Sequence, residues 1–191
     1  MSKPTVAERK NWWLMVYAHT SFEKSLDTCL LLLRHVTSTR DDLYLPLAVA
    51  IYAFYGRPFK MQRGIGKLPA NYIPKERNGI HDILIMFRDQ LLVHTDAIDV
   101  RQAGRPLHDV VYHQLGQRNW FSTSDPRPEV NFYRKVARYL QELLEKVKAD
   151  IDKIHERYGY MVPSIDGHHQ LSITEGELFT AHNPPANTLK F

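Results

Sequence analysis

The sequence predicts an all-α fold, an up-down four-helix bundle with a small hairpin insertion and an extended C-terminal tail. Apolar residues recur at three- and four-residue steps in four long segments, which is the spacing of one helix face. Glycine and proline gather between these segments and indicate where the helices end. A chain of 191 residues is long enough to bury one core. We therefore expect a bundle domain over residues 1–160, with the insertion at about 101–128, and a tail over 161–191.

The first two helices are expected at about residues 5–36 and 41–55. The second is apolar nearly all round, so we expect a central position in the bundle. Asp41 or Asp42 is suited to cap its N-terminus, and Gly56 ends it. The stripe of the first helix consists of Trp12, Met15, Val16, Phe22, Leu26, Cys29, Leu30 and Leu33.

The third and fourth helices are expected to begin near residues 74–78 and at residue 130. The third carries apolar residues to Leu91 and frays at about residues 94–99. The fourth shows the clearest stripe in the chain, and Gly159 followed by Pro163 terminates it. That stripe consists of Val130, Tyr133, Val136, Ala137, Leu140, Leu143, Leu144, Val147, Ile151, Ile154 and Tyr158.

Two segments depart from the helical pattern. Within residues 101–128 the stretches VVYHQL and NWFSTS have the composition of short strands, so we expect a small hairpin there. After Pro163 the sequence has no helical periodicity, and we expect an extended arm, disordered in part or docked on a partner.

Composition indicates a cytoplasmic protein. No run of 18 apolar residues occurs, so no membrane span is expected. The N-terminal residues lack the apolar region and cleavage site of a signal peptide. The single cysteine, Cys29, excludes a disulfide within the chain and fits a reducing compartment. Its place in an apolar helical stripe favours core packing over nucleophilic chemistry.

The positive charge is concentrated in the segment after the second helix. The formal net charge is +4, which is compatible with nucleic-acid binding. Residues 57–77 carry six basic side chains against one acidic side chain. Three interpretations remain open: the segment contacts RNA, it is only a solvated connection, or Arg57 braces the fold. The candidate RNA-binding residues are Arg57, Lys60, Arg63 and Lys67.

Arg88 and His94 form the best candidate for a catalytic pair. Six positions on a helix correspond to roughly 9 Å along the axis and about 120° around it, so the two side chains flank one groove. A second pair at similar spacing, Arg101 and His108, has glycine and proline between its members and therefore no fixed helical geometry. The absence of helix-breaking residues between Arg88 and His94, rather than their spacing, favours this pair.

These residue types are sufficient for RNA cleavage without a metal ion. RNA carries its own nucleophile, the 2′-hydroxyl, which attacks the adjacent phosphorus once a base removes its proton. His94 is suited to transfer that proton, because an imidazole titrates near neutral pH. Arg88 would neutralise the phosphoryl oxygens in the transition state, and Asp89 would orient a neighbouring side chain. The products would be a 2′,3′-cyclic phosphate and a 5′-hydroxyl.

The segment FRDQLLVHTD resembles the signature of HEPN domains (higher eukaryotes and prokaryotes nucleotide-binding). That signature is an arginine, a polar residue, a short spacer and a histidine at the end of the third helix of a four-helix bundle. Arg88, Asp89 and His94 match it, and the spacer length lies within the family range. Residues 53–59, AFYGRPF, also resemble a subset linked to abortive-infection systems. The resemblance covers about residues 5–158.

The resemblance implies a homodimer in which two Arg–His pairs share one cleft. It implies ribonuclease activity without a cofactor, in a toxin or phage-defence system. A partner such as a small nucleotidyltransferase is expected to act as the antitoxin. Other members of the family have lost activity and serve as binding modules.

A structural role for the same residues is the competing hypothesis. Arg88 could simply pair with Asp82, Asp89 or Asp96, and His94 could be a histidine that caps a helix end. The chain would then be a catalytically inactive, HEPN-like dimeric binding or regulatory module.

Other chemistries find little support. His81-Asp82 and His94-x-Asp96 suggest a metal site, but no HExxH motif or paired cysteines accompany them, so no metal is expected. No G-x-S-x-G elbow for a nucleophilic serine occurs. Base stacking on Trp120 stays open, although a role in the core or at a dimer contact is the simpler interpretation.

Overall fold

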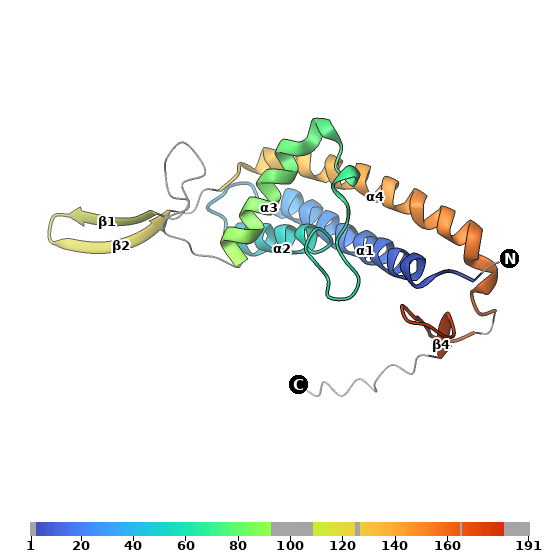
Figure 1. Ribbon diagram of the computed structural model, residues 1–191. Helices are drawn as coiled ribbons and strands as arrows, with labels where there is room; N and C mark the ends of the chain where they lie inside the picture. Colours follow the sequence, from blue (N-terminus) through green and yellow to red (C-terminus); the bar gives the residue numbers. More distant parts are fainter. Residues whose placement is uncertain (1–2, 93–108, 125–126, 165, 182–191) are drawn as a thin grey trace.

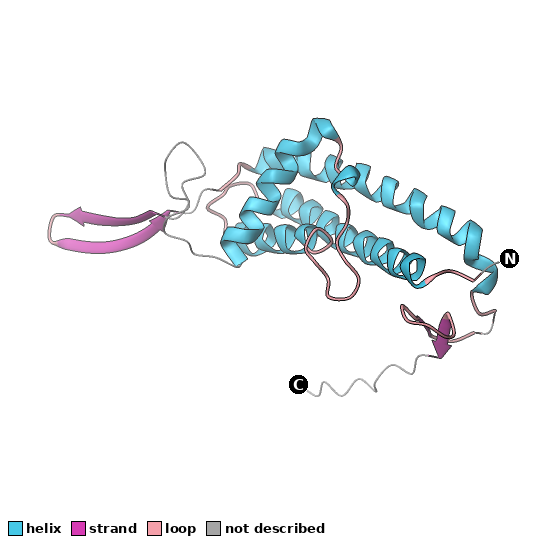
Figure 2. Ribbon diagram, viewed as in Figure 1, coloured by secondary structure: helices cyan, strands magenta, loops and turns pink. Residues whose placement is uncertain are grey.

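The computed structural model describes residues 3–92, 109–124, 127–164 and 166–181. Within these residues the chain is mostly helical with two small two-stranded sheets, so the predicted helix-rich fold is confirmed (Figures 1 and 2). The helices are α1 (Val6–His35), α2 (Tyr44–Gly56), α3 (Asn78–Leu92) and α4 (Val130–Tyr158). The strands are β1 (Asp109–Leu115), β2 (Arg118–Ser124), β3 (His169–Leu171) and β4 (Phe179–Ala181), and the short 3₁₀ helices are η1 (Ala70–Tyr72), η2 (Lys75–Arg77) and η3 (Gly159–Met161).

Helix α1 begins at a capping box and packs most of its apolar stripe against α2 and α4, but Val16 and Leu30 of the predicted stripe are exposed. The Thr5 hydroxyl accepts a hydrogen bond from the backbone N–H of Glu8, and the Glu8 carboxylate accepts one from the backbone N–H of Thr5. Two free N–H groups at the helix end are thereby satisfied. Phe22, Cys29 and Leu32 are fully buried.

The core lies where α1 contacts α2 and α4, and α3 covers α2 from the other side. Figure 1 shows α1 and α4 running side by side, with α3 crossing them obliquely. Helix α2 is tied to α1 by a hydrogen bond from the Ser25 hydroxyl to the Ile51 carbonyl, at 3.0 Å. Ile51 and Tyr52 are buried, which agrees with the apolar composition predicted to make this helix central.

Buried tyrosines join the helices through their hydroxyl groups. Tyr133 of α4 hydrogen-bonds to Tyr44 and Tyr52 of α2. Tyr139 bonds to Tyr55 at 2.9 Å. Burial raises the pKa of Tyr139 to about 12, so its phenol stays neutral. These pairs give hydrogen-bond partners to hydroxyl groups that would otherwise be buried in the core without one.

The C-terminal residues differ from the expected extended arm. Strands β3 and β4 form an antiparallel hairpin that packs on α1 and α4, where Trp12, Tyr158 and Leu178 make a second apolar cluster. Arg9, which is 4% exposed, donates hydrogen bonds to the carbonyl oxygens of Pro4, Thr174, Gly176 and Glu177. The Arg9 guanidinium thus anchors the turn between β3 and β4, and the hairpin covers Trp12. The tail beyond residue 181 lies outside the described residues.

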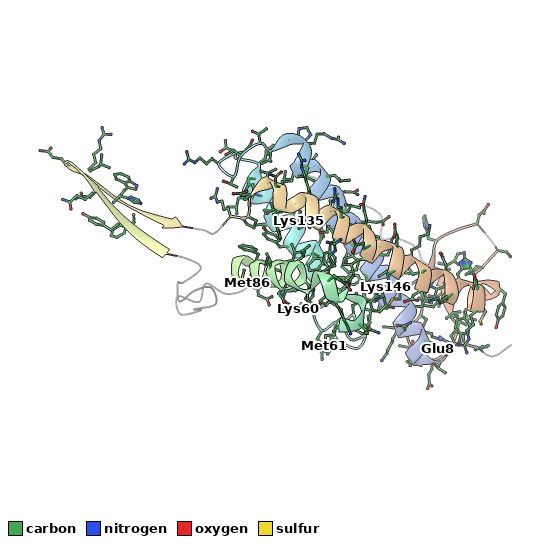
Figure 3. The ribbon with its side chains drawn as sticks, turned by 90° about the horizontal axis from the view of Figure 1, so that it is seen from above. Glu8, Lys60, Met61, Met86, Lys135 and Lys146 are labelled. Carbon is green, nitrogen blue, oxygen red and sulfur yellow. The ribbon has the colours of Figure 1, made fainter. Side chains whose placement is uncertain are left out.

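The hairpin expected in the insertion is present as β1 and β2. The strands pair antiparallel with Leu115 opposite Arg118, so the turn contains two residues, Gly116 and Gln117. Gly116 has φ +61°, a left-handed conformation that glycine adopts without strain. Figures 1 and 3 show this hairpin standing apart from the helices, and Phe121 on it is 71% exposed.

Cys29 behaves as the packing residue that the sequence indicated. Its thiol is buried and donates a hydrogen bond to the Tyr133 carbonyl oxygen at 3.2 Å. Burial raises the pKa of the thiol to about 12, which keeps it protonated and unreactive. Among the described helices, none has both the length and the apolar character needed to cross a membrane.

Candidate functional site

Helix α3 carries the candidate site near its C-terminal end. It continues directly from η2 at Asn78 and runs to Leu92, as the apolar spacing predicted. Leu84 and Phe87 are buried, and the Phe87 ring stacks on Tyr52 of α2 at 5.2 Å between centroids. Arg88 and Asp89 follow Phe87 and are partly exposed. His94, the predicted proton-transfer residue, lies outside the described residues.

Arg88 lies across the C-terminal end of α2. A Cβ atom built on Gly56 would meet Cγ and Cδ of Arg88 at 3.0 Å, closer than an ordinary contact. The missing side chain at Gly56 therefore makes room for the Arg88 stem. The Arg88 side chain remains 23% exposed, so it is not fully buried by these contacts.

Asp89 binds two cations at once. Its Oδ1 accepts a hydrogen bond from Nη1 of Arg88 at 2.6 Å, and its Oδ2 accepts one from Nζ of Lys60 at 2.6 Å. Burial opposes ionisation of Asp89, but the bonds from Lys60 and Arg88 outweigh it and lower the pKa of the carboxyl below its usual value. The carboxylate therefore stays charged at neutral pH, and the three side chains together carry one net positive charge.

The loop after α2 brings Lys60 to this position. Figure 3 shows Lys60 beside α3, on the side of the molecule where Met86 lies. The loop folds back on itself: the N–H of Leu68 donates to the Pro58 carbonyl at 2.7 Å, and Leu68 is buried. A bridge between Gln62 and Gly66 closes its tip. Lys60 is thus placed by a compact loop rather than by a loose connection.

His81 lies on the same face of α3 as Arg88, seven residues earlier. Its Nδ1 shares a hydrogen bond with the Tyr55 hydroxyl, and its ring packs edge-on against Phe59 at 4.8 Å. Burial lowers the pKa of His81, Lys60 lowers it further, and Asp82 opposes both. The imidazole is therefore neutral at pH 7.

From the sequence alone, His81 is a candidate only as a metal ligand, together with Asp82. The signal that would have drawn attention to it is its spacing from Arg88, because residues seven apart share a helix face. Within the described residues no group of three or more histidine, cysteine or carboxylate side chains is placed to hold a metal ion.

The four predicted RNA-binding residues separate in the structure. Lys60 joins Arg88 and Asp89, as described above. Arg57 instead contacts α1: its Nε donates to the Tyr17 hydroxyl at 2.9 Å, and its guanidinium lies 5.3 Å from the Tyr17 ring centre. This contact supports the interpretation that Arg57 braces the fold. Arg63 and Lys67 have exposed side chains on the same loop.

Arg88 pairs with Asp89 rather than with Asp82, which is exposed. Asp96, the third carboxylate considered for this pairing, is outside the described residues. An ion pair within the chain is what a purely structural role would produce. The Arg88 side chain is nevertheless partly exposed, so the pair is also compatible with anion binding.

No family model, curated protein or solved structure matches this chain. Its function is therefore inferred from the chemistry of the side chains. Arg88 and Lys60 place two cationic donors on either side of one carboxylate. Two adjacent cations that remain partly exposed are suited to hold a phosphate group.

Proposed function

We propose that this chain is a metal-independent endoribonuclease of the HEPN type, with an up-down four-helix bundle as its core. The observation that carries the proposal is the Arg88–Asp89–Lys60 cluster at the end of α3. Asp89 fixes both cations while each keeps part of its surface exposed, at 23% for Arg88 and 37% for Lys60. A phosphate that approaches the cluster gains charge-assisted hydrogen bonds from donors that are already oriented.

The cluster supplies the electrostatic part of the reaction. As the 2′-oxygen attacks phosphorus, negative charge grows on the phosphoryl oxygens, and Arg88 and Lys60 stabilise it. Asp89 holds the two cations in place and does not contact the substrate. His94 takes the 2′-hydroxyl proton or returns one to the leaving 5′-oxygen. The products are a 2′,3′-cyclic phosphate and a 5′-hydroxyl, and DNA is not cleaved because it lacks the nucleophile.

The assembly proposed for this enzyme is a cytoplasmic homodimer in which two copies of the cluster face one cleft. The biological role proposed is that of a toxin in a phage-defence system. Its antitoxin is expected to be a separate protein such as a small nucleotidyltransferase. The basis for these three statements is the resemblance of the segment around Arg88, Asp89 and His94 to the HEPN signature.

A binding module without catalytic activity is the alternative function. The observation that favours it is the ion pair between Arg88 and Asp89, which satisfies the arginine within the chain. In that case Arg88 and Lys60 stabilise the contact between α3 and the loop, and replacing them lowers the melting temperature without removing an activity.

The experiment is RNA cleavage in the presence of EDTA by the wild type and by Arg88→Ala, Lys60→Ala and His94→Ala. Arg134→Ala and Lys148→Ala on α4 are matched controls, because both side chains are exposed and lie outside the cluster. The proposal predicts that the three site variants lose at least about 100-fold in activity while staying folded, and that both controls remain active. If the site variants unfold or the wild type is inactive on varied RNAs, the module is favoured.

A further inference from the structure

An apolar cavity of about 400 Å³ lies between the outer face of α1 and the C-terminal hairpin. It is separate from the Arg88 cluster, which is built from α3 and the loop. Its volume falls within the range of small-molecule sites. The cavity is lined mainly by the apolar and aromatic side chains of Trp12, Trp13, Val16, Tyr17, Leu171 and Phe179.

The walls of this cavity are held in place before any ligand binds. Leu171 and Phe179 are directly opposite each other in the β3–β4 pair. Trp12 meets Phe179 edge-on at 5.7 Å, and Trp13 stacks on Tyr17 at 4.9 Å with an interplanar angle of 17°. The buried Arg9 anchors the hairpin turn through backbone carbonyls. Flat aromatic walls fixed in this way are suited to a flat ring.

The lining offers few hydrogen bonds to a ligand. Its polar side-chain groups are the hydroxyls of Tyr17 and Thr20 and the indole N–H groups of Trp12 and Trp13. A nucleobase carries several donors and acceptors on its edges, and burying them without partners is costly. The cavity therefore favours an apolar ring over a nucleobase.

One cation lies at the Tyr17 end. The Arg57 guanidinium contacts both the hydroxyl and the ring of Tyr17, at 2.9 Å from Nε and 5.3 Å from the ring centre. Among the described residues no carboxylate pairs with Arg57, whose side chain is exposed. An anionic group at this end of a ligand would thus find an available counter-charge.

We propose that this cavity binds a small apolar aromatic molecule that carries one anionic group, with its ring against Trp13 and Phe179 and its anion toward Arg57. The proposal does not depend on ribonuclease activity. It rests on the lining of the cavity and on the place of Arg57 beside it.

The test is isothermal titration calorimetry of the full chain with three probes. These are 2-naphthoate, uncharged 2-naphthol with the same two rings, and adenosine monophosphate. A ligand of this size binds in the millimolar range or tighter when its site is well formed, so the titrations extend to about 5 mM. The expected result is saturable binding of one naphthoate per chain, weaker binding of naphthol, and still weaker binding of the nucleotide.

Two variants and one control variant locate the site. Val16→Trp fills the cavity and abolishes naphthoate binding, whereas Leu31→Trp on the same helix does not, although both wild-type side chains are 44% exposed. Arg57→Gln weakens naphthoate binding by about two- to five-fold, the range for an exposed charge pair, and leaves naphthol binding unchanged. Melting curves confirm that each variant is folded.

Three results would overturn the proposal. The first is the absence of saturable naphthoate binding at about 5 mM, well above the affinity expected for a ligand of this size. The second is equal binding by the Val16→Trp and Leu31→Trp variants, which would place the ligand elsewhere. The third is a nucleotide affinity equal to that of naphthoate, which would assign the cavity to nucleotides instead.

Discussion

The Gly56→Ala substitution should displace the Arg88 side chain with little effect on the stability of the fold, so it tests the site separately from folding. Gly56 is the last residue of α2, and the new Cβ would sit 3.0 Å from Cγ and Cδ of Arg88. An ordinary carbon contact is about 3.5–4.0 Å, so the Arg88 stem must move by roughly 0.5–1 Å. Alanine is favoured over glycine in a helix by up to about 1 kcal/mol, and this gain offsets the strain of displacing a partly exposed side chain.

The free energy of unfolding is therefore expected to change by less than about 1 kcal/mol. Activity is expected to fall by about 10- to 100-fold, because a shift of this size removes the guanidinium from the phosphate. Gly79→Ala is the matched control, since Gly79 is in α3 and its added Cβ would meet nothing within 4 Å. Denaturant unfolding and RNA cleavage are measured on both variants.

Full cleavage activity in Gly56→Ala, with the free energy of unfolding unchanged, would refute this reasoning. It would mean that the position of the Arg88 side chain over α2 does not matter to the reaction. Equal losses of activity in Gly56→Ala and Gly79→Ala would also count against it, because Gly79 does not touch the cluster.

Three further predictions concern the cluster, the thiol and the hairpin anchor. Because the folded-state pKa of Asp89 is lowered, its pairs with Lys60 and Arg88 stabilise the fold above about pH 4, and this contribution is lost as pH falls through the folded pKa. The contribution is worth about 0–1 kcal/mol. The Asp89→Asn variant should lack this part of the pH dependence of the melting temperature. Native Cys29 should resist a thiol-specific disulfide reagent at pH 8 and react only on unfolding, since its thiol is buried with a pKa of about 12; rapid native modification would contradict this. Arg9→Met should lower stability by about 1–3 kcal/mol and speed proteolysis within the β3–β4 hairpin, because backbone carbonyl groups lose their donor; unchanged proteolysis would show that the hairpin does not depend on the anchor.

Helices α1, α3 and α4 were predictable from sequence because apolar residues recur along one face of each, and α2 was predictable because it is apolar nearly all round. The stripe from Val130 to Tyr158 matches α4 to the residue, and Thr5 with Glu8 accounts for the start of α1. The β1–β2 hairpin was also indicated, since two strand-like stretches flank Gly116.

The C-terminal hairpin was not predictable in the same way. Strands β3 and β4 have three residues each, which is too short for an alternating pattern to be recognised. Its position depends on Arg9, which lies more than 160 residues away along the chain. Arg9 is paired with backbone carbonyl groups, which every residue carries, and not with an acidic side chain. The sequence therefore holds no charge pair that would indicate this contact.

The candidate site was only partly predictable. Arg88 and Asp89 were found from their place on an apolar helix, and Lys60 from the charge of its loop. That Lys60 and Arg88 share the Asp89 carboxylate is a tertiary contact, and no local pattern specifies it. The spacing of His81 from Arg88 indicates a shared helix face, but it does not predict a neutral imidazole. The pKa of His81 is lowered by burial against Tyr55 and Phe59, which is a tertiary effect.

The most direct test of the central claim is identification of the RNA ends that the wild-type protein leaves in the presence of EDTA. RNA carrying a single 2′-deoxy substitution at the cut site serves as the matched substrate. We predict 2′,3′-cyclic phosphate and 5′-hydroxyl ends, no cleavage at the substituted position, and no product from Arg88→Ala. Ends with a 3′-hydroxyl and a 5′-phosphate, or cleavage at the 2′-deoxy position, would contradict the claim that Arg88 supports attack by the 2′-hydroxyl.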